Sequence, residues 1–225
     1  MSWKDRFPKE NRYFETDNGI LYCADCLKIL KKFPNESIDL VLTDPPYLKR
    51  YSYLYIETSK IFANILKNDT FAIYYASDYW FADIFPYMLN FLDYFYLFHL
   101  LLPGQNALIF PKNIIASAKT IIVLMKGKAK LLKRVRNVVV SPERKTGELH
   151  KWQQSVEPAL FFIENFSNKD DIVLDCFLGS GTTAIACEKL NRRWIGIEIN
   201  PEYCEIAKQR ILREIRQLEI ELKRN

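Results

Sequence analysis

Four consecutive residues, Asp44, Pro45, Pro46 and Tyr47, combine an acid, two rigid imino acids and an aromatic ring. They follow the apolar run 38–43 and so stand at the carboxyl end of a predicted strand, where α/β sheets bind ligands. Proline fixes the backbone, which holds its carbonyl as an oriented acceptor. The Asp44 carboxylate and the Pro45 carbonyl could together accept both hydrogens of an exocyclic amino group, while Tyr47 offers a face for a planar ring. A strand-terminating turn with a buried tyrosine is the alternative interpretation.

A second motif, 175–183, reads Asp-Cys-Phe-Leu-Gly-Ser-Gly-Thr-Thr and lies between an apolar run and a helical pattern. Such a glycine turn lets a ligand approach the backbone and aims helix N-terminal N–H groups at it. Glu198 ends the next apolar run, 23 residues after Asp175, close to the spacing at which an acid accepts hydrogen bonds from ribose hydroxyls. The pattern favours a nucleoside. A phosphate-binding loop would carry lysine after its last glycine, where this chain has Thr182. A dinucleotide site would carry a third glycine where this chain has Ala184, although that pattern sometimes tolerates alanine.

Cys23 and Cys26 have the spacing of half a metal or redox site. No second pair of this kind accompanies them, and the chain has only two histidines, His99 and His150. We therefore expect no metal and interpret the pair as partly buried thiols.

The elements that must position these motifs alternate between β-rich and helical patterns, which is typical of an α/β domain. We predict strands at 19–23, 38–43, 70–76, 107–110, 120–125, 172–176 and 194–198. We predict helices that open at Asp25, that span 59–67, 78–90 and 181–190, and that continue from Pro201 onward. The last helix is amphipathic and is expected to pack against the protein's own sheet, because its apolar repeat is too short for a coiled coil.

Length and composition fit one enlarged domain, 1–225, with 49% hydrophobic and 26% charged residues. No apolar run reaches the roughly 18 residues that span a bilayer. The polar N-terminus lacks a secretory signal, so we expect a cytoplasmic protein with no membrane partner. Five cysteines form an odd set, for which we expect free thiols.

Positive charge is concentrated between Lys126 and Lys151, a segment with nine basic and two acidic residues. The formal net charge of the whole chain is only +5, so the remainder is slightly acidic. A local basic segment predicts a polyanionic partner. A solvated charged face is the alternative interpretation.

The motifs TDPPY and LDCFLGSGTT, with RRWIGIEINPEY behind them, together resemble the amino-methyltransferases that modify DNA bases, in the permuted order called the beta class. In that family the proline-containing tetrapeptide precedes the cofactor loop, as it does here. The resemblance covers most of the chain, through the stretch 22–47 and roughly 152–211. It implies an α/β, Rossmann-like methyltransferase fold with a seven-stranded mixed sheet and helices on both faces, with S-adenosyl-L-methionine as cofactor and DNA as partner.

Carried over to this sequence, the resemblance implies that Asp44, Pro45, Pro46 and Tyr47 form the catalytic tetrapeptide. The residues implied to contact the cofactor are Asp25, Cys26, Ser155, Asp175, Phe177, Gly179, Gly181, Thr182 and Glu198. Within this set Glu198 would hold the ribose, and Asp25 would meet the adenine amino group with the Cys26 backbone nearby.

Two features depart from the family pattern. Family members often carry His-Pro-x-x-Lys-Pro before a helix that helps bind the methionine half of the cofactor, whereas here Gln154 and Ser155 replace the lysine and the second proline. We expect Ser155 to cap that helix and to offer its hydroxyl to a carboxylate. The region 48–170 is short for a segment that also reads bases, so we expect a simple or short recognition sequence.

DNA contacts are expected from a recognition insert at about 127–150 and from a tyrosine-rich mobile loop, 48–55, that closes over the target base. The basic residues assigned to DNA are Lys49, Arg50, Lys130, Lys133, Arg134 and Arg136. The last four are expected to neutralise phosphates, which makes binding salt-dependent.

The expected reaction requires the two motifs to lie side by side. A base amino nitrogen is a poor nucleophile, and acceptance of both N–H hydrogens would direct its lone pair at the methyl group, with alignment worth up to about 7–11 kcal/mol. The target base must be flipped out of the duplex. Methylation of cytosine carbon 5 would need a thiolate nucleophile, which enzymes of that kind supply from a Pro-Cys pair, and none of the ten prolines here precedes a cysteine. In the family an aspartate at the first tetrapeptide position accompanies adenine more often, so we predict N6 of adenine, with N4 of cytosine as the alternative.

Other functions stay open at this stage. Methylation of RNA or of a protein glutamine suits the same amino chemistry, but enzymes of that kind usually place the glycine loop first. A DNA-binding homologue that has lost the cofactor through Gln154 and Ser155, or an interaction protein using the terminal helix, are further alternatives. A homodimer and a cognate restriction endonuclease are open as partners.

Overall fold

The computed structural model describes residues 2–223 except 105–106, 110–111, 132 and 143–154. Its centre is a nine-stranded sheet. In spatial order the strands are β1 (Arg12–Glu15), β2 (Gly19–Cys23), β11 (Arg193–Glu198), β10 (Ile172–Asp175), β3 (Ile38–Thr43), β4 (Leu66–Ala76), β8 (Ala118–Lys126), β5 (Asp93–Leu101) and β9 (Val138–Val140). The sheet is mixed: β2, β11, β10, β3 and β4 run parallel, and β8 lies antiparallel between β4 and β5.

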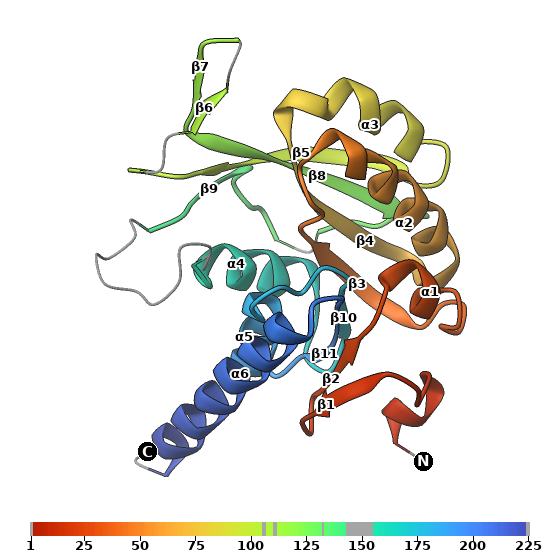
Figure 1. Cartoon of the computed structure of the whole chain (residues 1–225), viewed down its shortest axis with the longest axis vertical. Coiled ribbons are helices and arrows are strands. Elements are labelled where there is room, and N and C mark those ends of the chain that lie inside the picture. Colours follow the sequence, from red (N-terminus) through yellow and green to blue (C-terminus); the bar gives the residue numbers. More distant parts are fainter. Residues whose placement is uncertain (1, 105–106, 110–111, 132, 143–154, 224–225) are drawn as a thin grey trace.

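The predicted α/β fold is confirmed. The seven strands from β2 to β5 in this order form the expected mixed sheet, and two edge strands widen it to nine. One is β1, which pairs antiparallel with β2, and the other is β9, which pairs parallel with the end of β5. A separate hairpin of β6 (Ala107–Ile109) and β7 (Ile114–Ala116) projects from the sheet (Figure 1).

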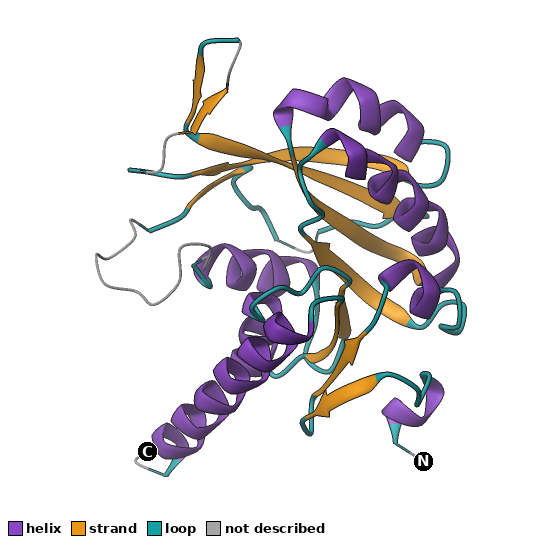
Figure 2. Cartoon of the chain, in the orientation of Figure 1, coloured by secondary structure: helices purple, strands orange, loops and turns teal. Residues whose placement is uncertain are grey.

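Helices cover both faces of the sheet (Figure 2). One face carries α1 (Cys26–Leu30), α2 (Ser52–Ile65) and α3 (Phe81–Met88), and the other carries α4 (Glu157–Phe166), α5 (Thr182–Lys189) and α6 (Pro201–Leu222). Side chains alternate between the two resulting cores because successive residues of a strand point to opposite faces. On β8, for example, Ile122 packs in one core and Ile121 in the other.

The predicted elements agree with the structure most closely around the two motifs. The strands at 19–23 and 38–43 are observed with the predicted bounds. Asp25 is the N-cap of α1, where its carboxylate accepts the Leu27 N–H at 2.8 Å. The helix expected at 59–67 begins earlier, at Ser52, and residues 66–67 already belong to β4. The helix expected at 78–90 is a 3-10 turn, Asp78–Trp80, followed by α3.

The last helix packs on the sheet along only part of its length. Cys204, Ala207 and Ile211 are buried against the core that contains α4 and α5, as predicted. Packing ends near Ile215, and Leu222 is 78% exposed, so the final turns leave the body of the protein (Figure 1).

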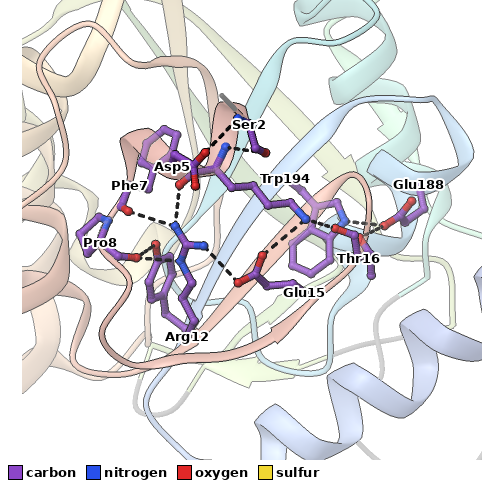
Figure 3. Close-up of polar contacts among 11 residues, drawn as sticks. Ser2, Asp5, Phe7, Pro8, Arg12, Glu15, Thr16, Glu188 and Trp194 are labelled. Atoms are coloured by element: carbon purple, nitrogen blue, oxygen red, sulfur yellow. Dashed lines mark hydrogen bonds and ion pairs between the residues drawn. The ribbon is translucent and has the colours of Figure 1, made fainter.

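A polar network fastens β1 and the N-terminal segment to the sheet (Figure 3). The Arg12 guanidinium donates to main-chain carbonyls, including that of Pro8 at 2.8 Å. The buried Glu188 carboxylate on α5 accepts from the Thr16 hydroxyl at 2.7 Å and the Trp194 indole at 2.8 Å. The Glu188 contacts lie at the start of β11, at the sheet edge opposite the two motifs, whereas Arg12 pairs with Tyr22 near the end of β2. Within the described residues no helix is both long and apolar enough to cross a membrane.

Candidate active site

The two motifs meet at one edge of the sheet. The strands β3 and β10 are parallel neighbours, so the segments that follow them emerge side by side. Thr43, the last residue of β3, donates its hydroxyl to the Asp175 carboxylate at the end of β10 at 2.9 Å. The tetrapeptide and the glycine turn therefore form adjoining parts of one site, as the sequence interpretation required.

Asp175 fixes this junction from inside. Its side chain is 5% exposed, and its oxygens also accept the Thr183 hydroxyl at 2.6 Å and the Phe177 N–H at 3.1 Å. Burial raises the pKa of Asp175 to about 6, although these donors oppose the shift. Because the carboxyl group is engaged within the protein, we propose a positioning role for it in place of the direct cofactor contact implied by the resemblance.

The glycine turn uses its two glycines differently. Both have positive φ, +54° at Gly179 and +90° at Gly181, a region that favours glycine. A Cβ placed on Gly181 would lie 3.2 Å from the Cβ of Ala207 on α6, so this glycine allows close helix packing. A Cβ on Gly179 would have only the Phe177 carbonyl oxygen nearby, at 3.9 Å. The backbone at Gly179 is therefore open to a ligand, next to Thr182, which begins α5.

Glu198 joins the glycine turn to the end of β11. Its carboxylate accepts the Gly179 N–H at 2.9 Å and the Asn200 N–H at 2.8 Å. A carboxylate has about four acceptor positions, so Glu198 can also accept from ribose hydroxyls. The parallel pairing of Glu198 with Cys23 brings the end of β2, and with it Asp25, to the same edge.

Asp25 borders a surface cavity of about 220 Å³. The cavity is lined by Asn11, Ala24, Asp25, Lys28, Ile29 and Lys32. The adjacent Cys26 is buried and is not among the residues that line the cavity.

The tetrapeptide is held by hydroxyl groups. The Tyr47 hydroxyl donates to Asp44 Oδ1. Pro45 is buried, and its carbonyl oxygen lies 3.4 Å from the Tyr55 hydroxyl, which also donates to the Tyr75 carbonyl at 3.1 Å. Pro46 is exposed. Burial, with Asp44 beside it, raises the pKa of Tyr47, so its hydroxyl keeps its proton and remains a donor.

Lys119, near the start of β8, is a further residue of this site that sequence reasoning missed. Its Nζ donates to the Tyr47 hydroxyl at 2.8 Å and lies 3.7 Å from Asp44 Oδ2. Because β8 is antiparallel to β4, its first residues lie at the edge where the parallel strands end. Only this topology brings Lys119 to the site, and no local motif signals it.

Lys49 and Arg50 follow the tetrapeptide after Leu48, in a 3-10 turn, and both are exposed. The Lys49 ammonium lies 5.1 Å from the ring centre of Trp80. The prediction of a mobile loop at 48–55 is wrong from Ser52 onward. The helix α2 begins at Ser52, and Leu54 and Tyr55 are buried.

The other four basic residues are exposed but are not gathered at the tetrapeptide. Lys126, at the end of β8, pairs with Thr70, at the far edge of the sheet. The segment that follows returns toward the site edge, where β9 pairs with the last residues of β5. Lys130, Lys133, Arg134 and Arg136 lie along this return, and Lys133 is 3.7 Å from Glu164 of α4. The remainder of the expected insert, 143–150, lies outside the described residues.

The helix-capping prediction for Ser155 is wrong. The N-cap of α4 is Val156, which has helical dihedral angles and makes no side-chain cap, and the Ser155 hydroxyl donates instead to the Glu157 carboxylate. The contact of Ser155 with the cofactor stays a prediction. His150 and Gln154 lie outside the described residues.

All five cysteines carry free thiols. Cys23 is partly exposed at the end of β2, whereas Cys26 begins α1 and is buried. Across the part of the chain that the structure describes, no three His, Cys, Asp or Glu side chains are grouped so that they could hold a metal ion.

Comparisons with known proteins point to one family. Residues 76–209, more than half of the chain, match the N6/N4 family model described as DNA methylase. The type II methyltransferase M.HpaI of Haemophilus parainfluenzae is 28% identical, over 85% of this chain and 73% of that protein. The structure of the PvuII DNA methyltransferase (cytosine-N4-specific) aligns with a TM-score of 0.78 at 20% identity, over 93% of this chain and 95% of that one. The M1.HpyAVI–SAM complex aligns with a TM-score of 0.71 at 25% identity, over 86% and 98%.

Proposed function

Because the chain belongs to the N6/N4 family of DNA methylases, which are S-adenosyl-L-methionine-dependent amino-methyltransferases, we propose that it methylates N6 of adenine in DNA. The observation that carries the proposal is the junction of the two motifs, fixed by the hydrogen bond from Thr43 to Asp175. This junction supports the proposal because it brings the tetrapeptide, whose Asp44 and Pro45 oxygens we propose as acceptors for the amino group, beside the glycine turn.

The residues at the turn fit the cofactor. Gly179 leaves space above the backbone, and Glu198 has acceptor positions left for ribose hydroxyls. Asp25, at the end of the neighbouring strand, would accept from the adenine amino group of the cofactor, with Phe177 and Thr182 completing the wall. When bound, S-adenosyl-L-methionine supplies a methyl group that its positive sulfur activates for a single displacement.

The tetrapeptide would direct the amino nitrogen of the target base. Asp44 and the Pro45 carbonyl accept its two N–H hydrogens, which draws the lone pair out of conjugation and aims it toward the cofactor side. The proton that the nitrogen loses after methylation passes to Asp44 or to water. Tyr47 provides a ring face for the flipped base, offsetting part of the stacking lost from the duplex.

Adenine is favoured over cytosine by the aspartate at position 44, since the resemblance links this residue more often to adenine. The PvuII enzyme is cytosine-N4-specific by name, and its 20% identity bears on the fold alone. N4 of cytosine is therefore the second candidate, because the amino chemistry is the same.

The domain organisation and partners are proposed on the same basis. We treat 1–225 as a single methyltransferase domain in which about 127–150 contributes to DNA recognition. One relative of 28% identity is named a type II methyltransferase, and we propose a cognate restriction endonuclease as the partner to seek. A homodimer is a further arrangement to test by the mass of the protein in solution.

The test is incubation of the purified protein with methyl-labelled S-adenosyl-L-methionine and unmodified DNA, followed by separation of the nucleosides. We expect label in N6-methyldeoxyadenosine. Label in N4-methyldeoxycytidine would move the proposal to the second candidate. Cofactor binding without any labelled nucleoside, over a panel of DNA sequences, would contradict methylation of DNA.

A further inference from the structure

The Tyr47 hydroxyl lies between a cation and an anion. It accepts a hydrogen bond from Lys119 Nζ at 2.8 Å and donates one to Asp44 Oδ1. Lys119 and Asp44 are themselves only 3.7 Å apart, and both side chains are about one quarter exposed. The Tyr47 hydroxyl, which both donates and accepts, therefore bridges the two members of this ion pair.

The ammonium of Lys119 is held in place by its surroundings. It lies 4.8 Å from the ring centre of Tyr47 and 5.9 Å from that of Tyr75, distances at which aromatic faces attract a cation. Its position on the sheet, paired with Leu100 of β5, adds a rigid backbone. The donor is thus as preorganised as the acceptor Asp44.

The Tyr47 hydroxyl offers one donor and one acceptor, and so does the edge of a nucleic-acid base at which an amino group adjoins a ring nitrogen. In adenine and in cytosine the amino group, a donor, adjoins an unprotonated ring nitrogen, an acceptor. A base whose amino group donates to Asp44 would bring such a nitrogen toward Lys119. The hydroxyl of Tyr47 presents the same pair of functions to the same two residues.

We propose that Lys119 reads the ring nitrogen beside the target amino group and that the Tyr47 hydroxyl occupies this site until the base enters. This inference rests on the proposed function, in which Asp44 accepts from the amino group. Entry of the base replaces the hydrogen bonds that Lys119 and Asp44 make to the Tyr47 hydroxyl by two of the same kind, so Lys119 and Asp44 stay satisfied while the Tyr47 hydroxyl gives up both partners. Lys119 thereby fixes the rotation of the base in its plane and directs the amino nitrogen.

The test uses oligonucleotides that carry the mapped target site with adenine, 1-deazaadenine or 7-deazaadenine at the methylated position. Each analogue lacks one of the two ring nitrogens that flank the amino group. With the wild-type protein we expect kcat/KM to fall roughly 10-fold or more for one analogue. Lys119→Met should lower kcat/KM for adenine by a similar factor and should no longer distinguish that analogue from adenine. If the base proves to be cytosine, 3-deazacytosine takes the same place.

Lys126→Met is the matched control. Lys126 lies on the same strand and is also partly buried, but it donates to the Leu66 carbonyl at 2.7 Å at the other edge of the sheet. This variant should discriminate between the bases as the wild type does. Lys119→Arg, which retains a donor, should recover part of the discrimination, and the affinity for S-adenosyl-L-methionine reports folding in every variant.

Tyr47→Phe provides an independent readout. This variant keeps the aromatic ring but lacks the hydroxyl that competes with the base for Asp44 and Lys119. We therefore expect a lower KM for DNA.

The inference is overturned if wild-type protein accepts both analogues like adenine, or if Lys119→Met retains the wild-type discrimination. Failure of the proposed function is distinguishable, because it would appear as the absence of any methylated nucleoside with the wild-type protein. Failure of the Asp44 assignment would appear as turnover that survives Asp44→Ala.

Discussion

Thr43 donates its hydroxyl to the Asp175 carboxylate across 2.9 Å, and this hydrogen bond joins the ends of two neighbouring parallel strands. Thr43 immediately precedes the tetrapeptide, and Asp175 begins the glycine motif. One buried contact between residues 132 positions apart in the chain thus joins the two motifs that we propose to cooperate in methyl transfer. Its strength should affect both stability and rate.

Thr43→Val tests this contact, because valine keeps the shape and removes the donor. The loss of a hydrogen bond to a buried carboxyl should lower the free energy of unfolding by about 1–3 kcal/mol. A small displacement of the tetrapeptide should lower kcat by roughly 10-fold. Denaturant unfolding and single-turnover assays measure the two effects. Thr43→Ser keeps the hydroxyl and should retain most of the rate; equal loss of rate in both variants would assign the effect to packing.

The stability of the protein should depend on pH through Asp175. Its pKa is raised by burial from 3.8 to about 6, so the folded state binds the proton more tightly than the unfolded state. The stabilisation from this group is complete below pH 3.8 and is lost as pH rises through about 6, a change of about 3 kcal/mol. Asp175→Asn should lack this component. Denaturant unfolding of both proteins from pH 4 to 8 should show their difference changing in this window, and a constant difference would contradict the assignment.

The two glycines of the turn should respond differently to alanine. Both positions have positive φ, so each substitution carries backbone strain of about 1–2 kcal/mol. Gly181→Ala also presses on Ala207 and should be the more destabilising of the two. Gly179→Ala places its methyl group in the space assigned to the cofactor and should weaken S-adenosyl-L-methionine binding by roughly 10-fold or more. Thermal unfolding and calorimetric titration separate these outcomes, and unchanged affinity in Gly179→Ala would place the cofactor elsewhere.

Salt dependence tests the DNA-contacting residues. Each phosphate contact that is lost should reduce the slope of log affinity against log salt by about 0.9. Lys49 and Arg50 adjoin the tetrapeptide, so their double alanine variant should reduce both affinity and slope. Replacement of Lys130, Lys133, Arg134 and Arg136 by alanine tests the return segment separately. An unchanged affinity and slope in the fourfold variant would remove that segment from the DNA interface.

The sequence was sufficient to predict the parts of the site that are local. The strands before each motif, the helix that opens at Asp25 and the position of Glu198 at the end of a strand depend on short-range periodicity and spacing, and they agree with the structure. The aromatic strand β5 was not predicted, because a run such as 93–101 suits either a strand or a buried helix until its neighbours are known.

What the sequence could not provide depends on topology. Lys119 reaches Asp44 only because β8 enters the sheet antiparallel, and the same reversal sends Lys126 to the opposite edge. Ser155 has the residue type of a helix cap, but the backbone of Val156 already adopts helical angles and the Ser155 hydroxyl is taken by Glu157. Such outcomes depend on tertiary packing, which local propensity does not describe.

One preparation of Asp44→Ala, assayed for both cofactor binding and methyl transfer, tests the role of Asp44 without ambiguity. Calorimetric titration gives its affinity for S-adenosyl-L-methionine, and a single-turnover assay with unmodified DNA gives its rate of methyl transfer. We predict an affinity close to that of the wild type and a rate lower by about 100-fold or more. Transfer at the wild-type rate would contradict the assignment of Asp44 as the acceptor of the amino group, and with it the proposed mechanism of methyl transfer.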